Sequence, residues 1–437
     1  MSPSALKLVT CLWGINKMKK LLILFIIGFL SLPLCLFAED AHAEDTEITD
    51  ENLAIESKER GPFRIKDRRV EVGLLHGRIG FANNFLSTEQ IFKKRMVIDL
   101  DDLGDGFKVN FDLGLTPLLF NYFSFDRQWG FGFSINVDTI GMLNLSGNML
   151  TFDKAKNDKS DIGGAAFVDF KASSFFHINK INSKIKANLS VYTPVMYVDP
   201  NISYTLDNSD TATKIDINYK VRVYTPTSME EDASFSFSPT PGIDIQLGAE
   251  YPLSEVLGLK EKVSFLDFIV GLDLLNIPLV PSTMKDYMEM SGRIGKGDKI
   301  DIENAEDLIE VEDDPVYGSR KKNIYRPFKM LAWANWKPFD VIPVSFIPTI
   351  GFAINPMYQE EPGSLEAGIK TRLDLANMLI ATIGTGYHDR LWKNSIDFIF
   401  NFRFFELNFG LDLRSQDFAK SWSGGGFGVN FGFKFGG

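Results

Sequence analysis

The feature that most constrains the fold is a two-residue alternation of apolar and polar side chains that recurs from Val70 to the end of the chain. It is clearest in the stretches 107–115 (FKVNFDLGL), 215–223 (IDINYKVRV) and 427–435 (FGVNFGFKF). Successive side chains of a β-strand point to opposite faces, so this period indicates strands with one apolar and one polar face. Similar runs begin near Phe131, Ile185, Phe235, Ile243, Phe328, Val344, Leu365, Leu379, Ile396 and Leu407. The sequence therefore predicts an all-β fold.

Helical signals are few and short. The stretch Ser87–Lys94 begins with the Ser-x-x-Gln spacing of a capping box, in which two side chains satisfy backbone N–H groups at the start of a helix. The stretches 252–262 and 304–311 are weaker candidates. We expect few short helices beside the strands.

The connections between the predicted strands alternate in length, which favours a membrane barrel over a soluble sandwich. Counted back from the C-terminus, they fall at 414–424, 404–405, 387–394, 376–377, 355–364, 337–343 and 278–325. Bacterial barrels carry short turns at one end and long external loops at the other. We therefore predict a transmembrane, antiparallel up-and-down β-barrel of about 14 strands, within a range of about 12 to 16.

Tryptophans give a second indication of the same fold. Trp129, Trp336, Trp392 and Trp422 fall near predicted strand ends or in connections. Membrane barrels carry aromatic side chains at these positions, because the ends of the strands lie at the two membrane–water interfaces. Aromatic side chains at the rim of a soluble core are the alternative interpretation.

The first 43 residues have the pattern of a bacterial signal peptide. Lys17, Lys19 and Lys20 precede an apolar run, and Ala41-His42-Ala43 supplies a cleavage site with small residues. A polar tail is expected at 44–68, and the barrel at 69–437. We therefore expect export through a cleaved signal peptide to the bacterial outer membrane.

Charge and cysteine content exclude several classes of protein. The chain has 437 residues and a net charge of −11. Without residues 1–43 it has 42 basic and 55 acidic residues, a net charge of −13, which is unfavourable for binding nucleic acid. Cys11 and Cys35 both lie in the predicted leader, so the exported chain would have no disulfide framework.

Motifs for catalysis and for cofactors are missing. Beyond the leader the histidines are His76, His177 and His388, each isolated in sequence, and no nucleophile or metal motif accompanies them. The acidic stretch within 278–325 lacks the ordered spacing of a calcium loop and is interpreted as a solvated external loop. We expect no enzyme and no cofactor; a lipid-hydrolysing barrel is a minor alternative.

The polar faces of the last strands predict the wall of an aqueous lumen. The side chains expected there are Asp397, Arg403, Glu406, Asp412, Arg414 and Lys434. Acids and bases are mixed, so this set fits either a structural ladder of salt bridges or a polar permeation path.

The end of the chain resembles the terminal strand of bacterial outer-membrane β-barrel proteins, which the insertion machinery recognises as a glycine followed by spaced aromatic residues. Gly428, Phe431, Phe433 and Phe435 carry this resemblance. Within the class, length and strand number resemble the long-chain fatty-acid transporter type, which implies fourteen strands and an N-terminal hatch. The segment 69–100 is the candidate plug, although the Asn-Pro-Ala of that family's hatch is absent, and no binding residue is carried over.

The leading functional hypothesis is a channel or transporter for small solutes or hydrophobic nutrients. Its expected partners are the lipid bilayer, the insertion machinery and a small or lipid-like solute. The alternative is a surface adhesin or structural protein that acts through its external loops. A soluble periplasmic β protein is a third interpretation.

Overall fold

The structure is a computed structural model, and all the residues that it describes belong to one compact unit, Gly61–Gly437. The described residues are 68–84, 107–125, 128–145, 161–178, 183–199, 216–227, 237–259, 267–295, 309–310, 316–339, 342–358, 362–376, 378–402, 404–423 and 425–437. The leader, nearly all of the polar tail, the predicted helix at 87–94 and Arg403 lie outside them.

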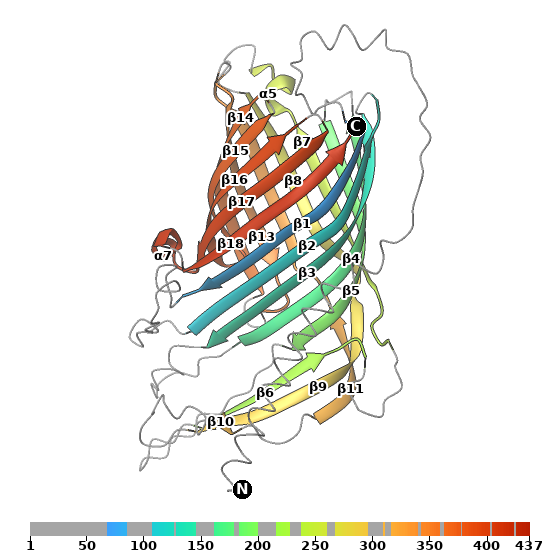
Figure 1. The fold of residues 1–437 in the computed structure, drawn as a ribbon, viewed down its shortest axis with the longest axis vertical. Helices are drawn as coiled ribbons and strands as arrows, with labels where there is room; N and C mark the ends of the chain where they lie inside the picture. The colour runs from blue at the N-terminus through green and yellow to red at the C-terminus, as the bar shows by residue number, and fades with distance from the viewer. Residues whose placement is uncertain are drawn as a thin grey trace. The chain divides into compact units, whose positions relative to one another are not determined.

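Fourteen antiparallel strands form a closed barrel, which confirms the predicted fold class (Figure 1). Each strand pairs with its neighbour in chain order, and β1 pairs with both β2 and β18, so the wall has no free edge. The wall strands are β1 (Val70–Asn83), β2 (Phe107–Phe123), β3 (Trp129–Leu145), β4 (Asp161–Ile178), β5 (Ser183–Asp199), β7 (Gly242–Tyr251), β8 (Asp267–Val280), β12 (Phe328–Lys337), β13 (Val344–Ile354), β14 (Gly363–Leu375), β15 (Leu379–His388), β16 (Leu391–Asn401), β17 (Phe405–Ser415) and β18 (Gly426–Gly436).

Four further strands extend the sheet beyond one end of the barrel, at the bottom of Figure 1. They are β6 (Asp216–Tyr224), β9 (Ser282–Gly295), β10 (Ile309–Glu310) and β11 (Val316–Ile324), and β9 pairs with the other three. The structure thus differs from the interpretation of 278–325 as a loop. The strands β9 and β11 of this segment show only a weak alternation of apolar and polar residues. Their buried apolar residues, such as Met284 and Ile324, are few and lie among polar side chains.

The candidate plug at 69–100 is also revised. Val70–Asn83 is a wall strand, paired in constant register with β2 and, with one bulge, with β18, while 85–106 lie outside the described residues. Its alternation is hard to see because a bulge between Leu74 and Gly77 shifts the register, with Leu75 at φ 52°. Such a bulge moves the following side chains to the other face.

Two short helices accompany the strands within the described part of the chain: α5 (Leu253–Val256) and α7 (Phe418–Ser423). The first lies inside the predicted stretch 252–262, whereas α7 was not predicted. At 304–311 the described residues form β10 rather than a helix. Among the described residues, no helix is both long and apolar enough to span a membrane.

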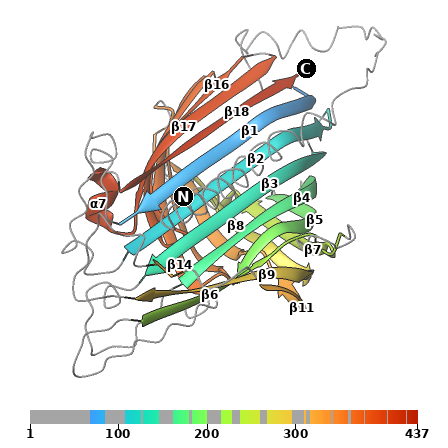
Figure 2. The same ribbon diagram turned by 60° about the horizontal axis from the view of Figure 1, so that its bottom comes forward.

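The two ends of the barrel differ, as Figure 2 shows from a second side. Short turns join the strands at 376–378 and 402–404, and at this same end the amide of Arg69 donates to the carbonyl of Gly437 at 2.8 Å. The opposite end carries most of the longer connections. One is shorter than predicted: 387–394 is a two-residue turn, Asp389-Arg390, with φ of 55° and 64°. Positive φ at both positions is typical of a type I′ hairpin.

The outer face of the barrel is apolar. Side chains such as Ile350, Leu365 and Ile383 are more than half exposed there. The side chain of Glu366, the strand neighbour of Leu365, points inward and pairs there with Lys329 and His388. A closed wall of this kind satisfies its backbone internally while presenting hydrocarbon to its surroundings.

Candidate functional site

Each predicted lumen-wall residue that the structure describes contacts a side chain on another strand or on its own strand. Asp397 accepts from Asn430 at 2.9 Å, and Lys434 donates to Glu406 at 2.8 Å. Arg414 binds Asp412 through Nη2 at 2.9 Å. Arg403 lies outside the described residues. These contacts form a ladder across β16, β17 and β18.

Arg414 also crosses the seam at which the barrel closes. Its guanidinium extends from β17 over β18 and β1 and pairs with Asp112 on β2. It can do so because Gly428 and Gly80 lie directly beneath it, where any Cβ would overlap the guanidinium. Gly428, predicted as part of an insertion signal, therefore also makes room for a buried ion pair.

The aromatic members of that signal lie on the opposite face of the same strand. Phe431, Phe433 and Phe435 are exposed on the outside of the barrel and pair in register with both β17 and β1. Recognition of these residues by insertion machinery stays a prediction.

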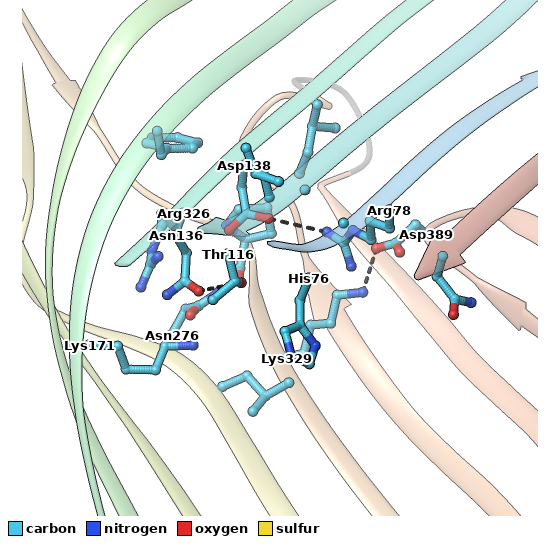
Figure 3. Close-up of a pocket in the computed structure, with 18 of the residues that line it drawn as sticks. His76, Arg78, Thr116, Asn136, Asp138, Lys171, Asn276, Arg326, Lys329 and Asp389 are labelled. Atoms are coloured by element: carbon cyan, nitrogen blue, oxygen red, sulfur yellow. Dashed lines mark hydrogen bonds and ion pairs between the residues drawn. The ribbon is translucent and has the colours of Figure 1, made fainter. Parts of the chain in front are cut away.

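A cavity lined by described residues lies inside the barrel and has a volume of about 580 Å³ (Figure 3). Its charged lining comes from β1, β3, β4, β12, the link before β12 and the β15–β16 turn. These charged side chains are Arg78, Asp138, Lys171, Arg326, Lys329 and Asp389. Apolar side chains such as Ile140, Phe167 and Leu275 and uncharged polar ones such as Thr116 and Asn136 also line it. The cavity thus offers both charged and apolar contacts to a small molecule.

Arg326 enters this cavity from a break in the wall. The ladder between β8 and β12 ends at Leu275↔Lys329, and the ladder between β9 and β11 begins at Ser282↔Ile324. Between them Asn276 has φ 54°, and prolines at 278, 281 and 327 lack the N–H that a ladder needs. The link between β11 and β12 turns inward at this break.

The guanidinium of Arg326 is fixed by carboxylates on strands beyond β8. Its Nε and Nη2 donate to the two oxygens of Asp244 on β7, at 2.7 and 2.8 Å. Nη2 also donates to Ser190 Oγ on β5 at 2.7 Å, and Nη1 lies 3.3 Å from Asp169 on β4. Planar two-point pairing of this kind is the strongest geometry available to an arginine. The link is thereby tied to three wall strands.

The ring of Tyr192 packs against the guanidinium of Arg326. Arg326 Cζ lies 4.9 Å from the centroid of Tyr192, whose hydroxyl donates to the carbonyl of Ile324 at 3.0 Å. The amide of Ser282 in turn donates to that hydroxyl at 3.3 Å. Tyr192 therefore joins the ends of β9 and β11 next to the break.

An apolar cluster closes the cavity toward the extension. It joins β3, β4 and β5 to β6, β9 and β11, and it includes a residue of the β13–β14 connection, on the opposite side of the wall. Its buried members are Met142, Ala165, Phe167, Tyr192, Tyr197, Tyr224, Met284, Ile324 and Met357. Phe167 belongs to both the cluster and the cavity lining. The extension and the connection thus cover the lumen at this end.

The rest of the charged lining forms pairs around the cavity. Arg78 lies 3.5 Å from Asp138, and Lys329 lies 3.3 Å from Glu366 and also binds Asp389, which Lys393 approaches to 3.3 Å. Partial burial alone would raise the pKa of Asp389, but the ammonium groups of Lys329 and Lys393 outweigh it and hold that pKa well below its usual range.

Sequence reasoning missed Arg326 and its partners. A charged residue just before Pro327, between two alternating runs, is the one local signal of a turn at this point. Asp169, Ser190 and Asp244 occupy ordinary inward positions of their strands, and no pattern in the sequence pairs them with Arg326.

Metal ligands are not grouped in the part of the chain that the structure describes: no three His, Cys, Asp or Glu side chains there could hold an ion. His76 and His388 are both held by other partners. His76 Nε2 lies 2.9 Å from the carbonyl of Phe433, and His388 Nδ1 lies 2.9 Å from Glu366.

Comparisons with known proteins give distant likenesses of fold. No family model and no curated protein matches the chain. Among solved structures, the Pseudomonas putida toluene transporter TodX is 9% identical with a TM-score of 0.45, over 85% of this chain and 90% of that one. A Pseudomonas aeruginosa FadL homologue is 8% identical with a TM-score of 0.44, over 85% and 90%.

The translocator domain of the Neisseria meningitidis autotransporter NalP is 8% identical with a TM-score of 0.33, over 88% and 95%. Scores at this level carry no argument about function. The description of this chain as a closed barrel of fourteen antiparallel strands rests on its own strand pairing.

Proposed function

We propose that this protein is an outer-membrane channel or transporter that passes small solutes through the lumen of its barrel. The observation that carries the proposal is the contrast between an apolar outer face and a charged interior that contains a cavity of about 580 Å³. Closed barrels with this polarity suit a bilayer outside and an aqueous path inside.

The same proposal includes the route to the membrane. We infer that residues 1–43 are removed on export from a bacterial cytoplasm, as the basic leader and its cleavage site indicate. The insertion machinery would then recognise Gly428, Phe431, Phe433 and Phe435 at the end of the chain. The exposed aromatic face of β18 supports this role.

The cavity lining favours a solute with both an apolar body and a polar group. Ile140, Phe167 and Leu275 offer apolar surface, while Lys171 places an ammonium on the cavity. The predicted wall residues Asp397, Glu406, Asp412, Arg414 and Lys434 would act mainly as the structural ladder that holds the path open.

Planar-bilayer conductance and liposome swelling test this function. Purified protein, refolded in detergent and checked by heat-modifiable migration, should conduct ions or admit small solutes. The variant Arg326→Met/Asp244→Asn should conduct better, because it frees the inward link while removing one carboxylate along with the guanidinium. Arg222→Met/Glu289→Gln is the matched control, since that pair lies in the extension. If the wild-type protein and both variants fold but neither conduct ions nor admit solutes, the proposal is overturned.

The extension favours a second candidate function. Beyond the barrel wall, β11 exposes Val316, Tyr317, Arg320 and Lys321 on a strand that pairs on one side with β9. An adhesin would use such a surface. Replacing residues 284–322 by a short turn should then abolish cell or matrix binding and leave heat-modifiable folding intact.

A further inference from the structure

The helix α7 lies against the outer wall of the barrel and projects from its side in Figure 1. It begins at Asp417, whose carboxylate accepts from the amides of Ala419 and Lys420 at 2.7 and 3.1 Å. This is the usual geometry of a helix N-cap. The helix is therefore fixed at its start by its own sequence.

The polar side of α7 faces the barrel. Ser421 is fully buried, and its hydroxyl accepts from Asn394 Nδ2 at 2.8 Å. Asn394 also accepts from Thr385 Oγ1 at 2.7 Å. Its strand neighbours Lys393 and Ser395 line an interior cavity, so Asn394 points outward. The helix thus covers a polar pair on a face that is otherwise apolar.

The aromatic side of α7 points away from the protein. Phe418 and Trp422 are 50% and 58% exposed. The ring of Phe418 meets Trp392 edge-on at 4.7 Å, and Trp392 lies 5.3 Å from Tyr387. Four aromatic side chains therefore form one group at this end of the wall: Tyr387, Trp392, Phe418 and Trp422. The exposed Ile396 follows on the same face of β16.

A surface helix in water buries its apolar side. In contrast, α7 buries Ser421 and exposes the rings of Phe418 and Trp422 beside Lys420. Trp and Tyr rings favour the boundary between lipid headgroups and acyl chains, where an apolar ring and a polar atom are both accommodated. The aromatic group continues directly from the apolar face of β16 and β17, so one surface can serve both.

We propose that α7, with Tyr387 and Trp392, is an anchor that inserts at the headgroup–acyl boundary of the bilayer and sets the height of the barrel. The proposal rests on the membrane function above. It names lipid as the occupant of this surface, because the helix covers the polar pair of Asn394 and Thr385 on the wall and turns the rings of Phe418 and Trp422 outward.

Probe accessibility tests the anchor. Cys11 and Cys35 are the two cysteines of the chain, so replacing both by serine leaves a background for single labels. A bimane label is placed at Trp422→Cys, at Phe431→Cys on the outer wall and at Arg320→Cys on the extension, in phosphatidylcholine vesicles. Quenching is measured with aqueous iodide and with doxyl-labelled lipid.

The expected result is that the label at position 422 is quenched by shallow doxyl lipid and shielded from iodide, while the label at 320 shows the opposite. Quenching of 422 by iodide as strong as that of 320 would overturn the anchor. If the label at 431 is also quenched by iodide, the membrane function itself fails, so the two failures are distinguishable.

A label-free measurement gives a second test. In the otherwise native chain, Trp422→Phe should remove a blue-shifted component of the tryptophan emission, and heat-modifiable migration should be unchanged. Loss of a red-shifted, water-exposed component instead would contradict the anchor.

Discussion

Two buried arginines, Arg414 at the seam and Arg326 at the break, fix two regions of the barrel in different ways. Arg414 belongs to a regular strand and reaches carboxylates on its own strand and on β2, across glycines. Arg326 lies in a link that has left the ladder, and its carboxylates belong to strands on the far side of β8.

The difference is one of burial as well as position. The carboxylates around Arg326 are nearly inaccessible, at 1% and 2%, whereas those around Arg414 are 22% and 12% accessible. A buried charge that loses its partner is destabilising in proportion to how little water can replace that partner. The ion pairs of Arg414 therefore join strands within the wall. Those of Arg326 hold the link between β11 and β12 in the lumen.

The largest expected effect is on the break. Arg326→Met leaves Asp169 and Asp244 buried without their cation, and we expect it to lower the free energy of unfolding by about 3–5 kcal/mol. Urea unfolding in detergent micelles measures this. Adding Asp244→Asn should recover part of the loss. If Arg326→Met alone is as stable as wild type, the pair of Arg326 and Asp244 does not hold the β11–β12 link in place.

A smaller loss is expected at the seam. Arg414→Met removes the partner of Asp412 and a partner of Asp112, which Arg78 Nε still approaches to 3.6 Å. Water can partly replace the lost guanidinium, so we expect a loss of about 2–3 kcal/mol in the same measurement. A loss larger than that of Arg326→Met would reverse the order that burial predicts.

The space beneath Arg414 can be tested separately. Gly80→Ala places a methyl group where the guanidinium lies, and we expect it to lower stability by about 1–3 kcal/mol. Gly141→Ala is the matched control, because a Cβ at that glycine meets no atom within 4 Å. Equal stability of the two alanine variants would show that Arg414 can leave the slot freely.

The smallest effect concerns the turn at Asp389. The lowered pKa of Asp389 means that its bridges stabilise the fold fully above the ordinary carboxyl pKa and are lost only as pH falls through the lowered value. Asp389→Asn should therefore cost about 0.5–1 kcal/mol, since the side chain is half exposed. The difference from wild type should stay constant from about pH 8 to pH 5 and shrink only at more acid pH. A difference that disappears near pH 6 would contradict this.

The seam region could be predicted from sequence, whereas the break could not. The strands β15 to β18 alternate cleanly, because each has an apolar outer side and a more polar inner side. Their pairs, such as Glu406 with Lys434, follow from simple register. In contrast, β4 (DIGGAAFVDFKASSFFHI) is rich in small residues, and β8 is apolar on both faces near the break, so their period is obscured.

The site around Arg326 could not be predicted from the sequence for a related reason. Arg326 reaches Asp244 and Asp169 because a ladder stops and a link turns inward, which depends on strands more than eighty residues apart in sequence. Local patterns report which face a side chain occupies, but they do not report which distant strand it meets.

The glycine pair beneath Arg414, Gly80 on β1 and Gly428 on β18, affects how the first and last strands of the barrel align. β1 and β18 are joined by no hairpin, so no turn fixes their alignment. A shift of two residues would place Arg78 or Ala82 opposite Gly428, where Gly80 now lies, and the Cβ of either would overlap the Arg414 guanidinium. Steric exclusion inside the barrel thus selects one alignment of the closing strands, and the interior acts as the template for closure.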